Sequence, residues 1–190
     1  MGLWNSLLGR SEPKGPNLDA LFAVPQAALT LQAAAGFNPT GVGSVCYRES
    51  EGAAFASVQS DVEQLLDLDG GTPVERTTDG FGFTWLTCRQ DSDSVSDLVT
   101  ELHAVNRSLE DQGFGPSLLC SVVGFSDVSG RRLGLVYLYK RGTFYPFAPL
   151  PGDRRDSSLE LQVRGLVASD IPLEAELGRW MALWGAPGLT

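Results

Sequence analysis

The stretch that decides the fold is SLLCSVVGFSDVSGRRLGLVYLYK, residues 117–140. Two apolar runs, Ser117 to Phe125 and Arg132 to Lys140, flank the sequence Asp127-Val128-Ser129-Gly130. Asp, Ser and Gly at this spacing are typical of a turn, so the stretch predicts a β-hairpin. Because apolar residues occupy neighbouring as well as alternate positions, we expect both faces of these strands to be covered, as in the centre of a sheet.

Three further segments have strand-like patterns. Val42 to Arg48 predicts one strand, and Val74 to Thr78 followed by Phe81 to Arg89 predicts another hairpin around Asp79-Gly80. Phe144 to Phe147 is expected at an edge of the sheet, because Pro146 cannot donate a hydrogen bond to a neighbouring strand.

Helical spacing of apolar residues predicts elements that cover the sheet. The clearest helix follows the capping-box sequence Ser94-x-x-Asp97 and ends at Gly113. An earlier helix begins after Asn17, is interrupted at Pro25 and ends at Gly36. The segment from Ala53 to Asp67 shows the same periodicity and predicts a helix between the first two strands.

The region after Pro151 is less regular. The sequence Ser157-x-x-Glu160 favours a helix, although Leu159, Leu161 and Val163 alternate as they would in a strand. A final short helix is predicted from Pro172 to Trp184, since Pro suits a first helical position and the apolar residues that follow have helical spacing.

These elements predict a single α+β domain, mainly an antiparallel sheet covered by helices. The domain is expected over residues 17–190, after an N-terminal apolar tip and flexible linker at residues 1–16. The string Gly-Phe-x-Pro-[Thr/Ser] occurs at Gly36 and again at Gly113. It indicates either a two-fold internal repeat of a helix-to-strand unit or the same local chemistry used twice, with Gly ending a helix and Phe packing behind it.

The chain has 190 residues, and a chain of this length buries about 70% of its unfolded surface without disulfides or metals. Its 23 acidic and 14 basic side chains give a net charge of −9, which opposes nucleic-acid binding. Cys46, Cys88 and Cys120 lie in apolar runs without a C-x-x-C pair. We therefore expect buried, reduced thiols, which favours a cytoplasmic protein. Contact with the membrane is expected to be at most peripheral, at its inner face.

The motifs that carry chemistry are missing from the sequence. His103 is the only histidine, and no second metal ligand is spaced on its helical face. Asp67-Leu-Asp69 and Asp91-Ser-Asp93 do not fit a calcium loop, and no phosphate-binding glycine loop occurs. No catalytic residue, metal site or cofactor is therefore predicted.

Two surfaces are candidates for binding a partner. If residues 2–8 are helical, they present one apolar stripe, which packs either on the domain itself or on a partner or membrane; its residues are Leu3, Trp4, Leu7 and Leu8. The second candidate is a set of basic residues with few acidic neighbours, suited either to an acidic partner or to ordinary ion pairs; its members are Arg131, Arg132, Lys140, Arg141, Arg154 and Arg155.

With these residues in view, the whole chain resembles the PspA-associated family PspAB, part of the phage-shock-protein system of high-GC Gram-positive bacteria. Among the strings that carry the resemblance are Pro16 to Phe22, Phe81 to Leu86, Leu102 to Asn106, Leu135 to Pro149 and Leu159 to Gly165. The resemblance implies a gene neighbourhood with PspA, a membrane-remodelling protein of envelope stress, and with an HtpX-like membrane protease. It implies no catalytic residues.

The sequence therefore leads to a non-catalytic adaptor that acts in PspA-linked envelope stress through protein–protein interaction. One alternative is a chaperone-like client-binding domain similar to type III secretion chaperones. Another is a Cys/His hydrolase in which His103 meets a cysteine. A polar cleft at His103 would favour the hydrolase, and a large apolar groove would favour the chaperone.

Overall fold

The computed structural model describes residues 16–48 and 74–189, and in it six strands form one antiparallel sheet in the order β2-β3-β1-β4-β5-β6. Their bounds are β1 Asn38–Arg48, β2 Glu75–Thr78, β3 Phe83–Arg89, β4 Leu118–Ser126, β5 Arg132–Leu138 and β6 Thr143–Phe147. The predicted α+β class is thereby confirmed. The helix predicted over residues 53–67 and the N-terminal tip lie outside the described residues.

The hairpin of residues 117–140 is present as predicted and provides two inner strands. Val122 pairs with Val136, and Gly124 pairs with Gly134. The Asp127 carboxylate closes the turn by accepting hydrogen bonds from the backbone N–H of Ser129 at 3.0 Å and of Arg131 at 2.9 Å. Local sequence therefore fixes the register of this hairpin.

The centre of the sheet is completed by β1, which lies between β3 and β4 and pairs antiparallel with both. It begins at Asn38, four residues earlier than predicted, because its first residues pair with the end of β4. The predicted hairpin of β2 and β3 is confirmed, as is the edge position of the strand that contains Pro146, β6.

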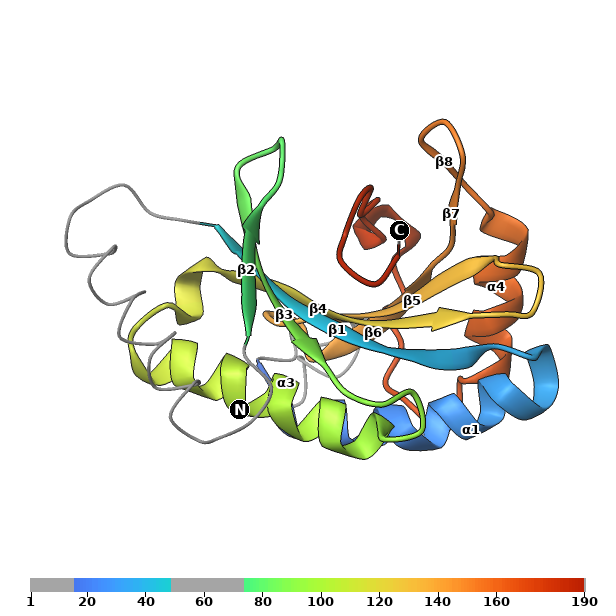
Figure 1. Cartoon of the computed structure of the whole chain (residues 1–190), viewed down its shortest axis with the longest axis horizontal. Helices are drawn as coiled ribbons and strands as arrows, with labels where there is room; N and C mark the ends of the chain where they lie inside the picture. Colours follow the sequence, from blue (N-terminus) through green and yellow to red (C-terminus); the bar gives the residue numbers. More distant parts are fainter. Residues whose placement is uncertain (1–15, 49–73, 190) are drawn as a thin grey trace, which may run out of the picture.

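Helices cover one face of the sheet (Figure 1). A 3-10 helix, η1 Leu18–Ala23, leads into α1 Val24–Ala35, and α3 Val95–Asp111 and α4 Ser157–Leu166 complete this layer. The apolar stripes of the helices pack against one face of the strands. Together they form a single core, which we call the helix-side core. Its members include Leu21, Leu31, Leu98, Leu102, Val163, Tyr47, Leu86 and Phe125.

The predicted caps differ from those in the structure. Ser94 precedes α3 but makes no side-chain cap hydrogen bond. Asp156, not Ser157, caps α4 by accepting from the Leu159 N–H at 3.0 Å. Glu160 is instead buried against Arg155, with Nε–Oε2 at 2.9 Å. The helix reading of this segment is confirmed and the strand reading is wrong.

The opposite face of the sheet carries the C-terminal strap, which we define as residues 172–189 (Figure 1). The predicted helix from Pro172 to Trp184 is wrong, since only η3 Leu177–Arg179 is helical. The start of the strap lies at the sheet edge. There the Phe144 N–H donates a hydrogen bond to the Pro172 carbonyl, and the Phe144 carbonyl accepts one from the Glu174 N–H, both at 2.7 Å. A two-stranded hairpin, β7 Pro149–Leu150 and β8 Arg154–Arg155, stands beside the strap.

The two Gly-Phe strings close their helices differently, and the two-fold repeat is not confirmed. Gly36 and Gly113 both have positive φ, and Phe37 and Phe114 are both buried. However, the Phe114 N–H bonds to the carbonyl five residues earlier, whereas that of Phe37 bonds to the carbonyl six residues earlier. Glycine capping and phenylalanine packing account for what the two strings share.

Within the part of the chain that the structure describes, one helical stretch, Leu18–Ala35, is long and apolar enough by length and composition to cross a membrane, with a mean hydropathy of 1.2. The sequence patterns above did not indicate it. In the structure this stretch consists of η1 and α1, and it contributes Leu21, Val24 and Leu31 to the helix-side core. Core packing is thus one reason for its apolar composition.

Candidate functional site

An apolar pocket opens on the strap side of the sheet, between the β2–β3 hairpin and the C-terminal strap. We call it the open-face pocket; its volume is about 230 Å³. Five strands and the strap contribute to it because side chains alternate between the two faces of each strand. The lining residues are Cys46, Asp79, Phe81, Phe83, Trp85, Leu119, Cys120, Leu138, Tyr145, Met181, Ala182, Leu183 and Trp184.

Asp79 fixes the hairpin side of the pocket. Its carboxylate accepts hydrogen bonds from the indole Nε1 of Trp85 at 3.0 Å and from the backbone N–H groups of Phe81 at 2.9 Å and Phe83 at 3.0 Å. Burial alone would raise its pKa, but these hydrogen bonds outweigh burial and lower the pKa of the carboxyl group. The carboxylate is therefore engaged in holding the turn and Trp85 in place.

Aromatic contacts fix the strap side. Trp180 stacks on Tyr145 with ring centroids 5.9 Å apart, and the Tyr145 hydroxyl donates to the Met181 carbonyl at 3.0 Å. Arg155 donates from Nη1 to the Trp180 carbonyl at 2.8 Å. These contacts hold residues 181–184 over the strands and leave the pocket between them and the hairpin.

Two large apolar side chains stand exposed at the mouth of the pocket. Phe81 is 70% exposed and Met181 is 60% exposed, and they come from opposite sides. Exposed apolar side chains grouped around a hollow mark interaction surfaces more often than isolated ones do. An aromatic residue and a flexible methionine are also side chains enriched in interfaces.

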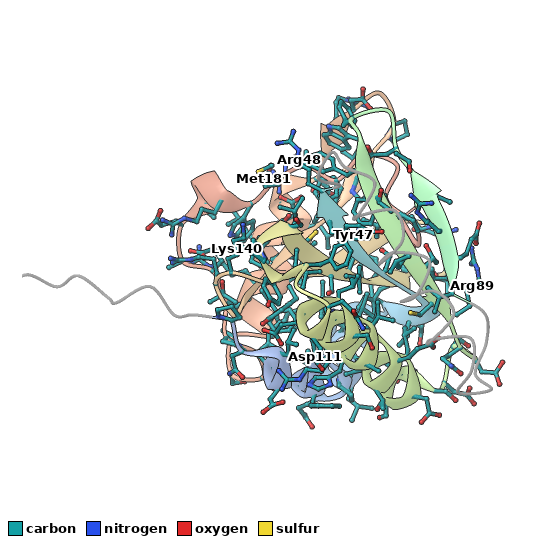
Figure 2. The ribbon with its side chains drawn as sticks, turned by 90° about the vertical axis from the view of Figure 1, so that its left-hand side faces the viewer. Tyr47, Arg48, Arg89, Asp111, Lys140 and Met181 are labelled. Atoms are coloured by element: carbon teal, nitrogen blue, oxygen red, sulfur yellow. The ribbon has the colours of Figure 1, made fainter. Side chains whose placement is uncertain are left out.

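Two basic residues lie at the ends of strands that line the pocket. The Arg48 guanidinium lies 5.5 Å from the centroid of the Phe83 ring, and Lys140 is exposed two residues after Leu138, which lines the pocket. In the view of Figure 2, Arg48 and Met181 lie above the strands and Asp111 lies below them on the helix side. The pocket thus combines apolar walls with positive charge outside.

The predicted basic residues are not gathered in one patch. Arg131 and Arg132 lie at the start of β5, and Lys140 and Arg141 follow its end, which separates the two pairs by about 20 Å along the strand. Three of the set are engaged in ion pairs: Arg131 with Asp127 at 2.7 Å, Arg141 with Glu174 at 3.1 Å and Arg155 with Glu160 at 2.9 Å. Arg154 is exposed and donates to the Pro151 carbonyl. Leu3, Trp4, Leu7 and Leu8 lie outside the described residues.

His103 lies on α3, on the helix side of the sheet. In the described part of the chain its hydrogen bond goes to Asp19, with Nε2–Oδ1 at 3.3 Å, and its ring lies 4.8 Å from that of Phe22. Cys46 and Cys120 line the open-face pocket on the other side. Among the described residues no group of three or more His, Cys, Asp and Glu side chains could hold a metal ion.

Sequence reasoning missed the residues of this pocket. The apolar spacing between Pro172 and Trp184 predicts only a short helix, and Phe81 is predicted only as part of a strand. One signal was available, since Phe81 follows directly on the Asp79-Gly80 turn, a place where a large aromatic side chain is hard to bury. The pairing of that hairpin with the strap could not be inferred from spacing.

In a comparison with protein families the chain matches the family described as PspAB, PspA associated protein B, over residues 1–188. No curated protein and no solved structure matches the chain.

Proposed function

The chain belongs to the PspA associated protein B family, and on this premise we propose that it is a non-catalytic accessory protein of PspA-linked envelope stress that acts by binding another protein. The observation that carries the proposal is the open-face pocket. Its volume of about 230 Å³ lies below the roughly 300–1,000 Å³ of typical small-molecule sites. A space of this size suits one or two apolar side chains of a protein partner.

Charge around the mouth defines the partner further. Arg48 and Lys140 flank a pocket whose carboxylate, Asp79, is engaged by its own turn. A bound segment would gain from carboxylates beside its apolar side chain, because opposite charges at the rim of an interface speed association and select the partner. The proposed occupant is therefore an apolar side chain on an acidic segment of a partner protein.

The family name makes PspA the first partner to test. Other phage-shock components, including an HtpX-like protease, are the next candidates. Binding to PspA would place the protein in the cytoplasm, at most peripherally on the inner face of the membrane.

The test is binding of the full chain to purified PspA from the same organism, measured by calorimetry. Phe81→Asp and Met181→Asp each place a charge at the mouth of the pocket, and each should weaken binding about tenfold or more, as expected for a central interface residue. Val128→Asp is the matched control, because Val128 is likewise an exposed apolar residue, lies in a hairpin turn and follows an Asp that caps the turn. Equal affinity for the Phe81, Met181 and Val128 variants would refute docking at the pocket.

The same apolar pocket also favours the second candidate, a chaperone-like client-binding domain. Such a domain would bind many unfolded apolar segments with similar affinity, whereas an adaptor binds one folded partner. Suppression of aggregation of an unrelated unfolded protein, lost in Phe81→Asp but kept in Val128→Asp, would support the chaperone role and count against the adaptor.

The N-terminal residues Leu3, Trp4, Leu7 and Leu8 are proposed as an additional contact with the partner. Deleting residues 1–10 should then weaken binding to PspA while leaving the melting temperature of the protein unchanged. A lower melting temperature with unchanged binding would assign these residues to the stability of the protein instead.

A further inference from the structure

Cys46 and Cys120 face each other at the floor of the open-face pocket. They are direct partners in the pairing of β1 with β4, both line the pocket, and both belong to the core on the strap side. Their exposed fractions are 2% and 5%. Two thiols that are far apart in the sequence are thus brought into one place.

The spacing of paired strands suits a bond between them. Directly opposed residues of antiparallel strands have Cα atoms about 4.5–5.5 Å apart, and disulfides form at Cα separations of about 4.4–6.8 Å. A register irregularity follows immediately, between Cys46 and Tyr47, and such irregularities increase local twist. The neighbouring Cys120 thiol, together with burial, raises the pKa of the Cys46 thiol.

We infer that Cys46 and Cys120 are a reversible thiol-modification site, which closes to an intramolecular disulfide in exchange with the disulfide of a low-molecular-weight thiol. Cys120, as its thiolate, attacks one sulfur of the small disulfide RSSR, which forms a mixed disulfide and releases RS⁻. The Cys46 sulfur then attacks the Cys120 sulfur, which forms the Cys46–Cys120 bond and releases a second RS⁻. The two protons lost by the cysteines leave with the two released thiols, so RSSR is reduced as the pair is oxidised.

Access distinguishes this pair from the third cysteine. Cys88 lies on the other face of the sheet in the helix-side core, opposite Gly43 and against Glu101 of α3. It has no cysteine as its strand partner and does not line the pocket. Burial raises the pKa of the Cys88 thiol as well, so thiol pKa does not distinguish Cys88 from the pair. What distinguishes the pair is the pocket and the second thiol. The inference needs no partner protein and is independent of the proposed docking role.

The experiment exposes the folded, reduced protein to redox buffers made from reduced and oxidised glutathione, and in parallel to bis(2-hydroxyethyl) disulfide, which is smaller. Free thiols are then trapped with a maleimide under denaturing conditions and counted by mass spectrometry. The wild-type protein should fall from three maleimides to one, and dithiothreitol should restore three. Cys88→Ala should fall from two to none, whereas Cys46→Ala and Cys120→Ala should not form an intramolecular disulfide.

Peptide mapping of the wild-type protein keeps the test independent of whether the variants fold. A linked peptide pair that contains Cys46 and Cys120 is expected in the oxidised monomer. Retention of three maleimides in the folded protein under buffers that oxidise the urea-unfolded chain would overturn the inference. A disulfide that involves Cys88, or one that joins two chains, would overturn it too.

Discussion

The Glu174 carboxylate of the strap accepts a hydrogen bond from Nε of Arg141 at 3.1 Å, and this pair joins the start of the strap to the turn between β5 and β6. The Glu174 side chain is only 2% exposed. It also accepts from the Thr143 hydroxyl at 3.0 Å and from the Glu176 N–H at 3.1 Å. A buried charge with this many partners holds the strap to the sheet edge.

Glu174→Gln should therefore destabilise the protein by about 2–3 kcal/mol at pH 7, because hydrogen bonds to a charged group become bonds to a neutral one. Burial opposes ionisation, yet the bonds from Glu176, Arg141 and Thr143 lower the pKa of Glu174. The stabilisation is thus present above the unfolded pKa of about 4.3 and is lost as the pH falls through the lower, folded value. Urea unfolding at pH 7 and at about pH 3 measures this difference.

Glu176→Gln is the control for this prediction. Glu176 is two residues away and pairs with Arg179, but its side chain is 64% exposed, so its replacement should change stability by less than about 0.5 kcal/mol. A loss in Glu174→Gln that is as large at low pH as at pH 7 would show that the charge of Glu174 is not what holds the strap.

Gly124 lies against the C-terminal end of the strap. A Cβ atom at this position would lie 2.6 Å from the Gly188 carbonyl oxygen and 2.8 Å from Oγ1 of Thr40, so Gly124→Ala must push the strap away. We expect a loss of about 1–3 kcal/mol and faster hydrogen exchange at residues 186–189. Gly165→Ala in α4 is the control, because a Cβ atom added there would meet nothing within 4 Å, and it should be neutral or stabilising.

The strands and turns could be predicted from sequence because local chemistry determines them. The Asp127 turn, the glycines that end α1 and α3, and Pro146 at the sheet edge each act within a few residues. The position of β1 between β3 and β4 could not be predicted, since apolar alternation indicates that a strand is buried but not which strand it pairs with.

The strap and the pocket escaped prediction for the same reason. The apolar residues from Leu173 to Trp184 have helical spacing. However, Trp180 stacks on Tyr145, and the backbone of residues 172–174 is hydrogen-bonded to β6. These tertiary contacts outweigh a weak helical preference. The pocket then gathers residues from 46 to 184, a combination that appears only when the sheet is assembled.

His103→Ala tests the hydrolase alternative. His103 contacts Asp19 and Phe22 near the surface of α3, so we expect a loss of about 1 kcal/mol or less in stability and unchanged binding to PspA. Thermal unfolding and calorimetry measure the two effects. An unchanged fold with lost function in the host would instead revive a catalytic role for the histidine.

The separation of the basic residues leads to a prediction about salt and charge reversal. Lys140 follows the pocket-lining end of β5, whereas Arg132 begins the same strand about 20 Å away. Exposed charges are screened over about 10 Å at 0.1 M salt, so a partner docked at the pocket senses Lys140 and not Arg132.

We therefore expect Lys140→Glu to slow association with PspA severalfold, and raised salt to reduce the wild-type rate toward that of the variant. Arg132→Glu, which makes the same change in net charge, should leave the rate close to that of the wild type. Association rates from surface plasmon resonance at low and at raised salt decide between these outcomes. If Arg132→Glu slowed association as much as Lys140→Glu, the net charge of the protein would be steering the encounter. That result would contradict docking of the partner at the mouth of the pocket.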